Sequence, residues 1–235
     1  MDPRAWLLPV PADRRPRRLG QLVVGLALYG AGQALLVVAG IGVDPWDVLH
    51  QGLSRTVGGQ IGTWTNLLGA VVLLAWIPLR QRPGVGTVAN VLLVGTSLNL
   101  TLLVLPHPTG LPLQLLTMVA GVALVAVATA TYIGAGLGPG PRDGLMTGIA
   151  ARGHSVRVVR TGLELAVLLT GWLLGGTVGA GTVVFAVGIG PAVHVLLPLL
   201  RVGGSRPAMP GPAADDVGAG VVSRSVAAGP PPACR

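Results

Sequence analysis

The residues best suited to bind a solute or an ion stand in two short stretches, 40–55 and 136–151, that interrupt long apolar sequence. These stretches bring carboxylates, an imidazole and a guanidinium close to apolar segments. An ionisable side chain at membrane depth usually serves a binding or relay function. One asparagine and one glutamate inside the apolar segments join this group. The candidate binding residues are Asp44, Asp47, His50, Asn66, Arg142, Asp143 and Glu164.

Catalytic and metal-binding groups are not recognisable in the sequence. It has no Ser/His/Asp or Cys/His arrangement and no Gly-rich loop in a phosphate-binding context. The single cysteine, Cys234, supports neither a disulfide framework nor a zinc site. We therefore expect that the protein is not an enzyme and uses no cofactor and no metal.

Each of the two stretches has the pattern of a helix N-terminus, with a capping residue, a proline at the first position and an acid in the first turn. The residues are Asp44, Pro45 and Asp47 in the first stretch and Gly140, Pro141 and Asp143 in the second. A helix of about twelve residues is too short to cross ~30 Å of hydrocarbon. Each short helix lies at the interface, dips back into the membrane or caps the bundle. Two interpretations of the acids Asp47 and Asp143 are open. Either they only cap their helices, or the positive N-terminal ends of the two half-helices face a solute from opposite sides.

The other polar residues have structural alternatives as well. Asn66, like Asn90, Ser97 and Asn99, is expected to hydrogen-bond a neighbouring helix. Glu164 follows Arg160 by four residues, so it either pairs with that arginine or serves a functional site. His194 either bonds a neighbouring helix or relays protons.

The composition predicts a protein whose solvent is mostly lipid. The chain is 51% hydrophobic and 10% charged, with a mean hydropathy of +0.71, whereas soluble domains carry roughly 25% charged residues. The arginines lie between apolar segments and form no single basic face, which argues against a nucleic-acid partner. Segments of about 20 residues, the length that crosses a bilayer, lie at 20–41, 61–79, 85–105, 112–135, 159–176 and 180–201.

The arginines also predict the orientation, because basic residues concentrate on the cytoplasmic side. With a cytoplasmic N-terminus and six crossings, Arg55 is the arginine between the first and last segments that falls outside. The cytoplasmic group is Arg14, Arg15, Arg17, Arg18, Arg80, Arg82, Arg142, Arg152, Arg157, Arg160, Arg201 and Arg206. We expect a multi-pass protein of the bacterial inner membrane with both termini in the cytoplasm. Trp64 and Trp76, near opposite ends of one segment, are expected to anchor it at the two interfaces.

An internal repeat relates the two halves of the chain. Residues 40–52 recur at 136–148, residues 70–76 at 166–172, and residues 84–88 at 179–183, so the offset is 96 and then 95. Each half holds three crossings, and an odd number makes the second half enter the membrane from the opposite side. The predicted fold is an all-α bundle of six transmembrane helices, an inverted repeat of three, with two short non-spanning helices. Its parts are a basic N-terminus (1–18), two repeats (19–106 and 111–202) and a disordered cytoplasmic tail (203–235).

The stretch from Gly40 to Ser54, which contains Gly-Val-Asp-Pro-Trp-Asp, and the following Ile61-Gly62-Thr63 resemble bacterial integral membrane proteins of the YczE/YyaS/YitT type. The resemblance covers roughly residues 19–203. It implies a polytopic membrane protein and transfers no catalytic residues. The second stretch departs from the motif, with Arg142 in the place of Trp46 and Gly140 in the place of Asp44.

Two functions fit these observations. Inverted repeats with Gly/Pro-interrupted segments at matching positions are typical of secondary transporters, which predicts a small-solute transporter or exporter. The alternative is a non-transporting membrane scaffold or regulator that assists a partner enzyme or export system. The expected partners are the lipid bilayer and either a small solute or ion or a membrane protein. A polar cavity at mid-depth, lined by both short helices, would favour transport.

Overall fold

A computed structural model describes residues 8–203, which form α-helices and no strand. The helices belong to one compact unit. They are α1 (Arg15–Ala39), α2 (Pro45–Thr56), α3 (Ile61–Leu79), α4 (Val85–Leu102), α5 (Leu111–Gly134), α6 (Pro141–Ala150), α7 (Val156–Leu173) and α8 (Ala180–Leu200). The predicted tail, apart from Gly203, lies outside the described residues.

The long helices follow the predicted apolar segments, and α2 and α6 follow the two short stretches. Five helices are long and apolar enough to cross a membrane: α1, α3, α4, α5 and α8. The sixth long helix, α7, carries Arg157, Arg160 and Glu164 within its 18 residues. The largest boundary difference is at the N-terminus. There α1 begins at Arg15, because Arg18 is 2% exposed and donates a 2.7 Å hydrogen bond to the Ala135 carbonyl.

The centre of the bundle is the antiparallel pair of α1 and α5, which α4 covers on the α1 side and α8 on the α5 side. Close approach requires glycine at this centre. A Cβ on Gly32 would lie 2.7 Å from a Val125 methyl, and one on Gly30 would lie 2.4 Å from the Val94 carbonyl oxygen. Buried apolar side chains such as Leu26 fill the remaining space. Burial of polar side chains beside this core is therefore a feature that needs an explanation.

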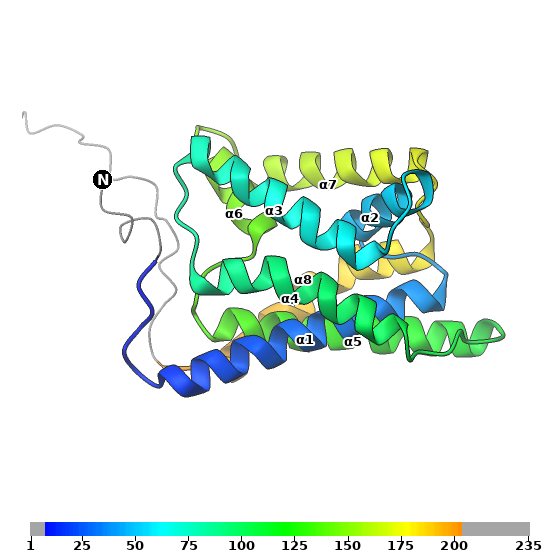
Figure 1. Ribbon diagram of the computed structural model, residues 1–235, viewed down its shortest axis with the longest axis horizontal. Coiled ribbons are helices and arrows are strands. Elements are labelled where there is room, and N and C mark those ends of the chain that lie inside the picture. The colour runs from blue at the N-terminus through cyan, green and yellow to red at the C-terminus, as the bar shows by residue number, and fades with distance from the viewer. Residues whose placement is uncertain (1–7, 204–235) are drawn as a thin grey trace, which may run out of the picture. The chain divides into compact units, whose positions relative to one another are not determined.

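The two remaining long helices, α3 and α7, pack around the short helices α2 and α6, as Figure 1 shows. Helix α3 contacts α4, α6 and α2, whereas α7 contacts α2 and α6. The pair α3–α4 is in close contact, but α7 makes hardly any contact with α8. We call these two helix pairs the α3–α4 seam and the α7–α8 seam. The first is closely packed and the second is not.

Helices α2 and α6 begin near each other inside the bundle and run toward opposite ends of it (Figure 1). At the end of α2, Arg55 donates hydrogen bonds to Gly175 and Thr177 in the α7–α8 connection. Beyond the end of α6, Arg152 donates to the Pro78 carbonyl near the C-terminus of α3 at 2.6 Å. Helices of 12 and 10 residues are about 18 and 15 Å long. Together they match the thickness of one bilayer core.

The backbone leading into each short helix has the same conformation. Gly40 and Gly136 have φ of 70° and 67°, and Gly42 and Gly138 have φ of 116° and 119°. These positive values favour glycine because its lack of a Cβ removes the steric penalty. The repeated glycine pattern of the sequence therefore encodes two copies of one local chain path.

Each path is also tied in the same way to a long helix of the other half of the chain. The Gly86 N–H of α4 donates to the Leu137 carbonyl at 2.8 Å, and the Gly181 N–H of α8 donates to the Ile41 carbonyl at 2.9 Å. Leu137 lies 96 residues after Ile41 and Gly181 lies 95 after Gly86, the two offsets of the sequence repeat. Each half of the chain therefore anchors the entry to the other half's short helix.

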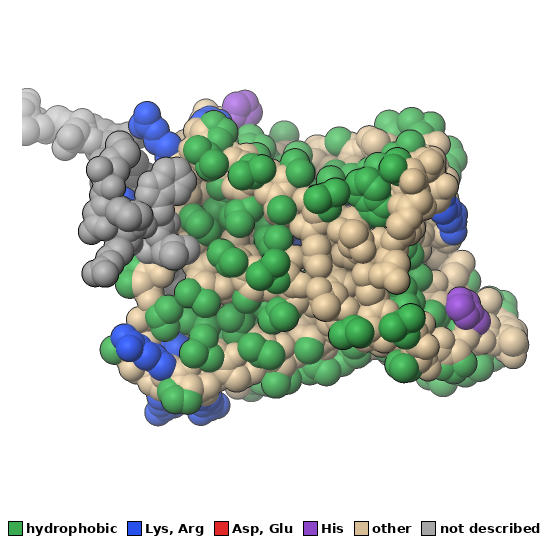
Figure 2. Space-filling view, viewed as in Figure 1, with side chains coloured by type: hydrophobic (Ala, Val, Ile, Leu, Met, Phe, Trp, Pro, Cys, Tyr) green, Lys and Arg blue, Asp and Glu red, His purple; other side chains and the backbone are tan. Residues whose placement is uncertain are grey.

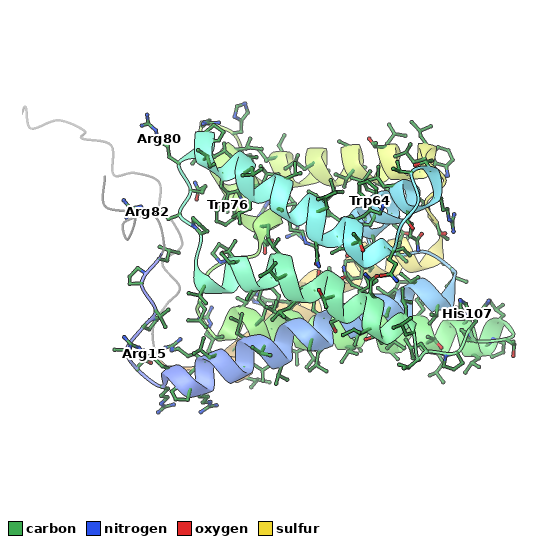
Figure 3. The ribbon with its side chains drawn as sticks, viewed as in Figure 1. Arg15, Trp64, Trp76, Arg80, Arg82 and His107 are labelled. Carbon is green, nitrogen blue, oxygen red and sulfur yellow. The ribbon has the colours of Figure 1, made fainter. Side chains whose placement is uncertain are left out.

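Hydrophobic side chains are spread over the whole visible face in Figure 2, and arginines lie toward its ends. Figure 3 places Arg15, Arg80 and Arg82 at one end and Trp64 and His107 at the other. The prediction that Trp76 is an interface anchor is wrong. Its side chain is 2% exposed and its indole N–H donates to the Pro141 carbonyl at 2.9 Å.

Candidate functional site

The start of α2 is built by Asp44. Its extended backbone places the carboxylate where Oδ1 accepts the Asp47 N–H at 2.8 Å, and Pro45 occupies the first helical position. The other carboxylate oxygen, Oδ2, accepts a weak 3.4 Å hydrogen bond from the Gln33 amide of α1. Asp44 is completely buried. The predicted cap is therefore present, and one of its oxygens remains directed to neighbouring side chains.

Asp47 stands in the first turn of α2, and its carboxylate contacts a histidine. Its Oδ1 lies 2.9 Å from Nδ1 of His50, one turn later, and the same nitrogen lies 3.2 Å from the Thr65 hydroxyl of α3. Asp47 is completely buried and His50 is 4% exposed. This chain of polar groups links the first turn of α2 to α3.

Arg142, in the first turn of α6, reaches across to the start of α2. Its Nη1 lies 3.6 Å from Asp44 Oδ2, and its Nη2 donates a hydrogen bond to the Tyr29 hydroxyl of α1. The guanidinium also lies over the Tyr29 ring, 5.6 Å from its centroid, a distance at which a cation and an aromatic face attract each other. Arg142 thus joins the starts of both short helices to the central helix.

The acid of α6, Asp143, lies on the other side of the α6 N-terminus. A Cβ on the capping residue Gly140 would be 3.2 Å from Asp143 Oδ2 and 3.3 Å from the Tyr132 hydroxyl. The Tyr132 and Tyr29 rings meet edge to face at 6.0 Å. Asp143 therefore belongs to the same region as Asp44 and Asp47, with the tyrosines between the helices.

A cavity of about 50 Å³ lies where these elements meet. Both short helices line it, together with α1, α3 and α4. Its polar and aromatic lining residues are Tyr29, Gln33, Trp46, His50, Thr65, Asn90 and Arg142. Gly69, Val72 and Val94 also line it and stand near the middle of α3 and α4. The cavity is therefore level with the middle of the long helices and away from their ends.

Three buried polar atoms of this region have no hydrogen-bond partner among the described residues. They are the Gln33 carbonyl oxygen, the Trp46 indole nitrogen and the second carboxylate oxygen of Asp47. Gln33 is 1% exposed and Trp46 is 9% exposed, and both line the cavity. An unpaired buried polar group costs about 1–3 kcal/mol. The arrangement thus leaves hydrogen-bonding capacity at the cavity.

Two of the predicted site residues lie elsewhere. Asn66 accepts a 2.9 Å hydrogen bond from the Gly95 N–H and donates to Leu92 and Thr96, so it joins α3 to α4. Glu164 accepts a 3.0 Å hydrogen bond from Arg160 on α7. Both follow the structural alternatives stated for them.

A metal site is not formed by the described part of the chain. Within residues 8–203, no group of three or more His, Cys, Asp or Glu side chains is arranged to hold a metal ion. The acids of the cluster face an arginine, a histidine and the first turns of helices instead.

Four residues of the site were not predicted from the sequence: Tyr29, Gln33, Thr65 and Tyr132. The first two had a signal, because they are polar and four residues apart in an otherwise apolar segment, so they share one helix face. Tyr132 and Thr65 had no comparable signal. Their place depends on how α5 and α3 pack.

The chain is similar to proteins that span most of its length. The model of the family of unknown function DUF6198 matches residues 16–198. An uncharacterized protein of Haemophilus influenzae is 42% identical over 180 residues, which are 76% of this chain and 83% of that protein. No solved structure matches the chain.

Two proteins of Bacillus subtilis are also similar. The uncharacterized membrane protein YczE is 32% identical over 179 residues, 75% of this chain and 80% of that protein. The uncharacterized protein YyaS is 26% identical over 185 residues, 76% of this chain and 91% of that protein. The resemblance drawn from the Gly-Val-Asp-Pro-Trp-Asp stretch is confirmed.

Proposed function

The chain belongs to the DUF6198 family and is a membrane protein, and we propose that it transports a small solute across the bilayer through the site between α2 and α6. The observation that carries the proposal is the cavity lined by the starts of both short helices, level with the middle of the long ones. Half-helices that meet at a solute site near mid-depth are a recurring construction of secondary transporters. A scaffold has no need for buried, partly unpaired polar groups at its centre.

The paired chain paths around the two short helices support an inverted repeat. Each path has the same glycine conformations and the same hydrogen bond to the other half. In such a protein, one half adopts the shape of the other during transport, so that the central site opens to each side in turn. We extend the proposal to an inner-membrane location with both termini in the cytoplasm. The gathering of Arg15, Arg80 and Arg82 at one end supports this orientation (Figure 3).

The difference between the two outer seams supports this kind of motion. In the α3–α4 seam, a Cβ on Gly62 would lie 1.9 Å from the Gly95 carbonyl oxygen, so the helices touch. The repeat equivalents of Asn66 and Gly95 are Gly162 and Gly190, and a Cβ on either would meet nothing within 4 Å. One seam is closed and its counterpart is open, as expected for one of two alternating states.

His194 lies on the open seam and does not make the bond to a neighbouring helix that was one of its two predicted roles. Its repeat equivalent, Asn99, accepts a 2.9 Å hydrogen bond from the Gly62 N–H of α3. His194 is exposed on α8 and makes no hydrogen bond within the described residues, so the expected bond to a neighbouring helix is not formed here. Closure of α7 onto α8 would give His194 such a partner.

Counterflow in proteoliposomes tests the proposal across a panel of small charged, zwitterionic and neutral solutes. The test variant is Asp47→Ala/Asp143→Ala, and the matched control is Glu164→Gln, which changes an acid that is paired on α7 outside the cluster. We expect uptake by the wild type and the control and little uptake by the double variant. Uptake no higher for the wild type than for the double variant across the whole panel would contradict transport. It would favour the scaffold or regulator alternative.

A further inference from the structure

The charges of the central site indicate what it binds. We propose that the site takes a small monovalent organic cation of the ammonium or guanidinium type, an inference that rests on the proposed function and specifies its solute. Asp44, Asp47 and Asp143 carry three negative charges when ionised, and Arg142 carries one positive charge. The two helix N-termini add about half a positive charge each. With His50, which contacts Asp47, in its neutral form, the cluster is then short of about one positive charge in a poorly solvating interior.

The unpaired hydrogen-bonding atoms also favour an organic cation. Two of the three unpaired buried atoms are acceptors. One is the side-chain carbonyl oxygen of Gln33, which lines the cavity, and the other is Oδ2 of Asp47, which contacts the lining residue His50. An ammonium group has three N–H donors and a guanidinium has five or more, and neither has an acceptor to conflict with these oxygens. The one unpaired donor, the Trp46 indole N–H, would suit a hydroxyl or carbonyl on the same solute.

Arg142 does not satisfy these acceptors itself. Its guanidinium is engaged by the Tyr29 hydroxyl and ring and by Asp44. The pairing also occupies the Tyr29 face, which leaves Trp46 as a lining aromatic residue with no cation over its ring in the described part of the chain. Indole rings bind cations best among the aromatic side chains.

An anion is the alternative suggested by Arg142 and by the two helix N-termini. The acids already occupy these positions. Asp44 Oδ1 accepts a first-turn N–H of α2, and Asp143 lies against the capping residue of α6. An anionic solute would have to displace these carboxylates or lie beside them without a compensating charge. The structure therefore favours a cation.

The size of the cavity limits the solute. A volume of about 50 Å³ holds a few water-sized groups. Methylammonium and guanidinium are of this size, whereas a peptide or a lipid headgroup is far larger. The first probes should therefore be these two cations.

Charge movement across proteoliposomes on a solid-supported membrane tests the inference with the full chain. Methylammonium chloride and guanidinium chloride are applied at low millimolar concentration against sodium chloride at equal ionic strength, and sodium formate serves as the anionic probe. We expect a positive current toward the interior with at least one organic cation. In Asp47→Asn this current should fall at least tenfold, while Glu164→Gln keeps it. Thermal unfolding of each variant identifies one that fails to fold, and quenching of tryptophan fluorescence by the same cations in the wild type gives a binding readout that needs no variant.

The outcomes separate the two proposals. A current with formate and none with the cations would overturn the cation assignment and leave transport standing. Saturable binding of a cation with neither charge movement nor counterflow of the same cation would support the cation site and contradict transport. Failure of the folded wild type to bind either cation would overturn the inference, and so would an undiminished current in Asp47→Asn.

Discussion

Substitution Gly95→Ala should destabilise the protein, whereas the equivalent substitution Gly190→Ala should not. A Cβ on Gly95 would lie 2.0 Å from the Gly62 carbonyl oxygen and 2.4 Å from Asn66 Oδ1. Neither oxygen belongs to a flexible chain end, because one is backbone and the other accepts the Gly95 N–H at 2.9 Å. Helices α3 and α4 must therefore move apart, which weakens that hydrogen bond.

The magnitude follows from three contributions. Overpacking of a tight contact costs about 1–3 kcal/mol, and a weakened buried hydrogen bond costs about 1 kcal/mol. The higher helix propensity of alanine returns up to about 1 kcal/mol. We expect a net loss of roughly 1–3 kcal/mol for Gly95→Ala, or about 2–12 °C in Tm for a chain of this size. For Gly190→Ala, where a Cβ meets nothing within 4 Å, the propensity contribution alone predicts no loss.

Thermal unfolding in lipid nanodiscs, followed by the intrinsic tryptophan fluorescence, measures both variants against the wild type. Gly188→Ala, another α8 substitution with nothing within 4 Å, is the matched control. Equal destabilisation by Gly95→Ala and Gly190→Ala would show that the α7–α8 seam is packed like the α3–α4 seam, and the reasoning would be refuted. If the open seam closes during transport, Gly190→Ala should keep its Tm and lower the rate of counterflow.

Further substitutions test three other contacts, each by thermal unfolding. Trp76→Phe removes the indole donor of a buried hydrogen bond to α6 and leaves part of the indole's space empty, for a loss of about 1–3 kcal/mol. Its repeat equivalent Trp172, 59% exposed, should tolerate the same change within about 0.5 kcal/mol. Asp44→Ala removes the cap of α2 and the buried carboxylate nearest to Arg142. Asp44→Asn keeps a good cap, so its loss of stability should be about 1 kcal/mol smaller. Equal losses of stability would contradict the capping role. Glu164→Gln breaks an ion pair on a helix surface and should change stability by less than about 0.5 kcal/mol.

The local pattern of the sequence predicted much of the fold. Hydropathy placed the long helices within a few residues, because a segment that must satisfy its own backbone in lipid has few alternatives to a helix. The start of α2 followed from Asp44 and Pro45, since a capping acid before a proline is a strong local signal. Trp76 was misplaced because an aromatic residue near a helix end can meet either an interface or another helix.

The sequence by itself determined the helices, the membrane environment, the repeat and the acids that begin α2 and α6. These properties depend on residues that are neighbours along the chain or on spacing that recurs within it. Only the tertiary structure decided that both short helices begin at one central cavity, that Arg142 reaches Asp44 and Tyr29, and that the α7–α8 seam is open. The physical reason is that these contacts join residues far apart in sequence, and glycine-rich apolar helices can pack in several ways until close approach selects one.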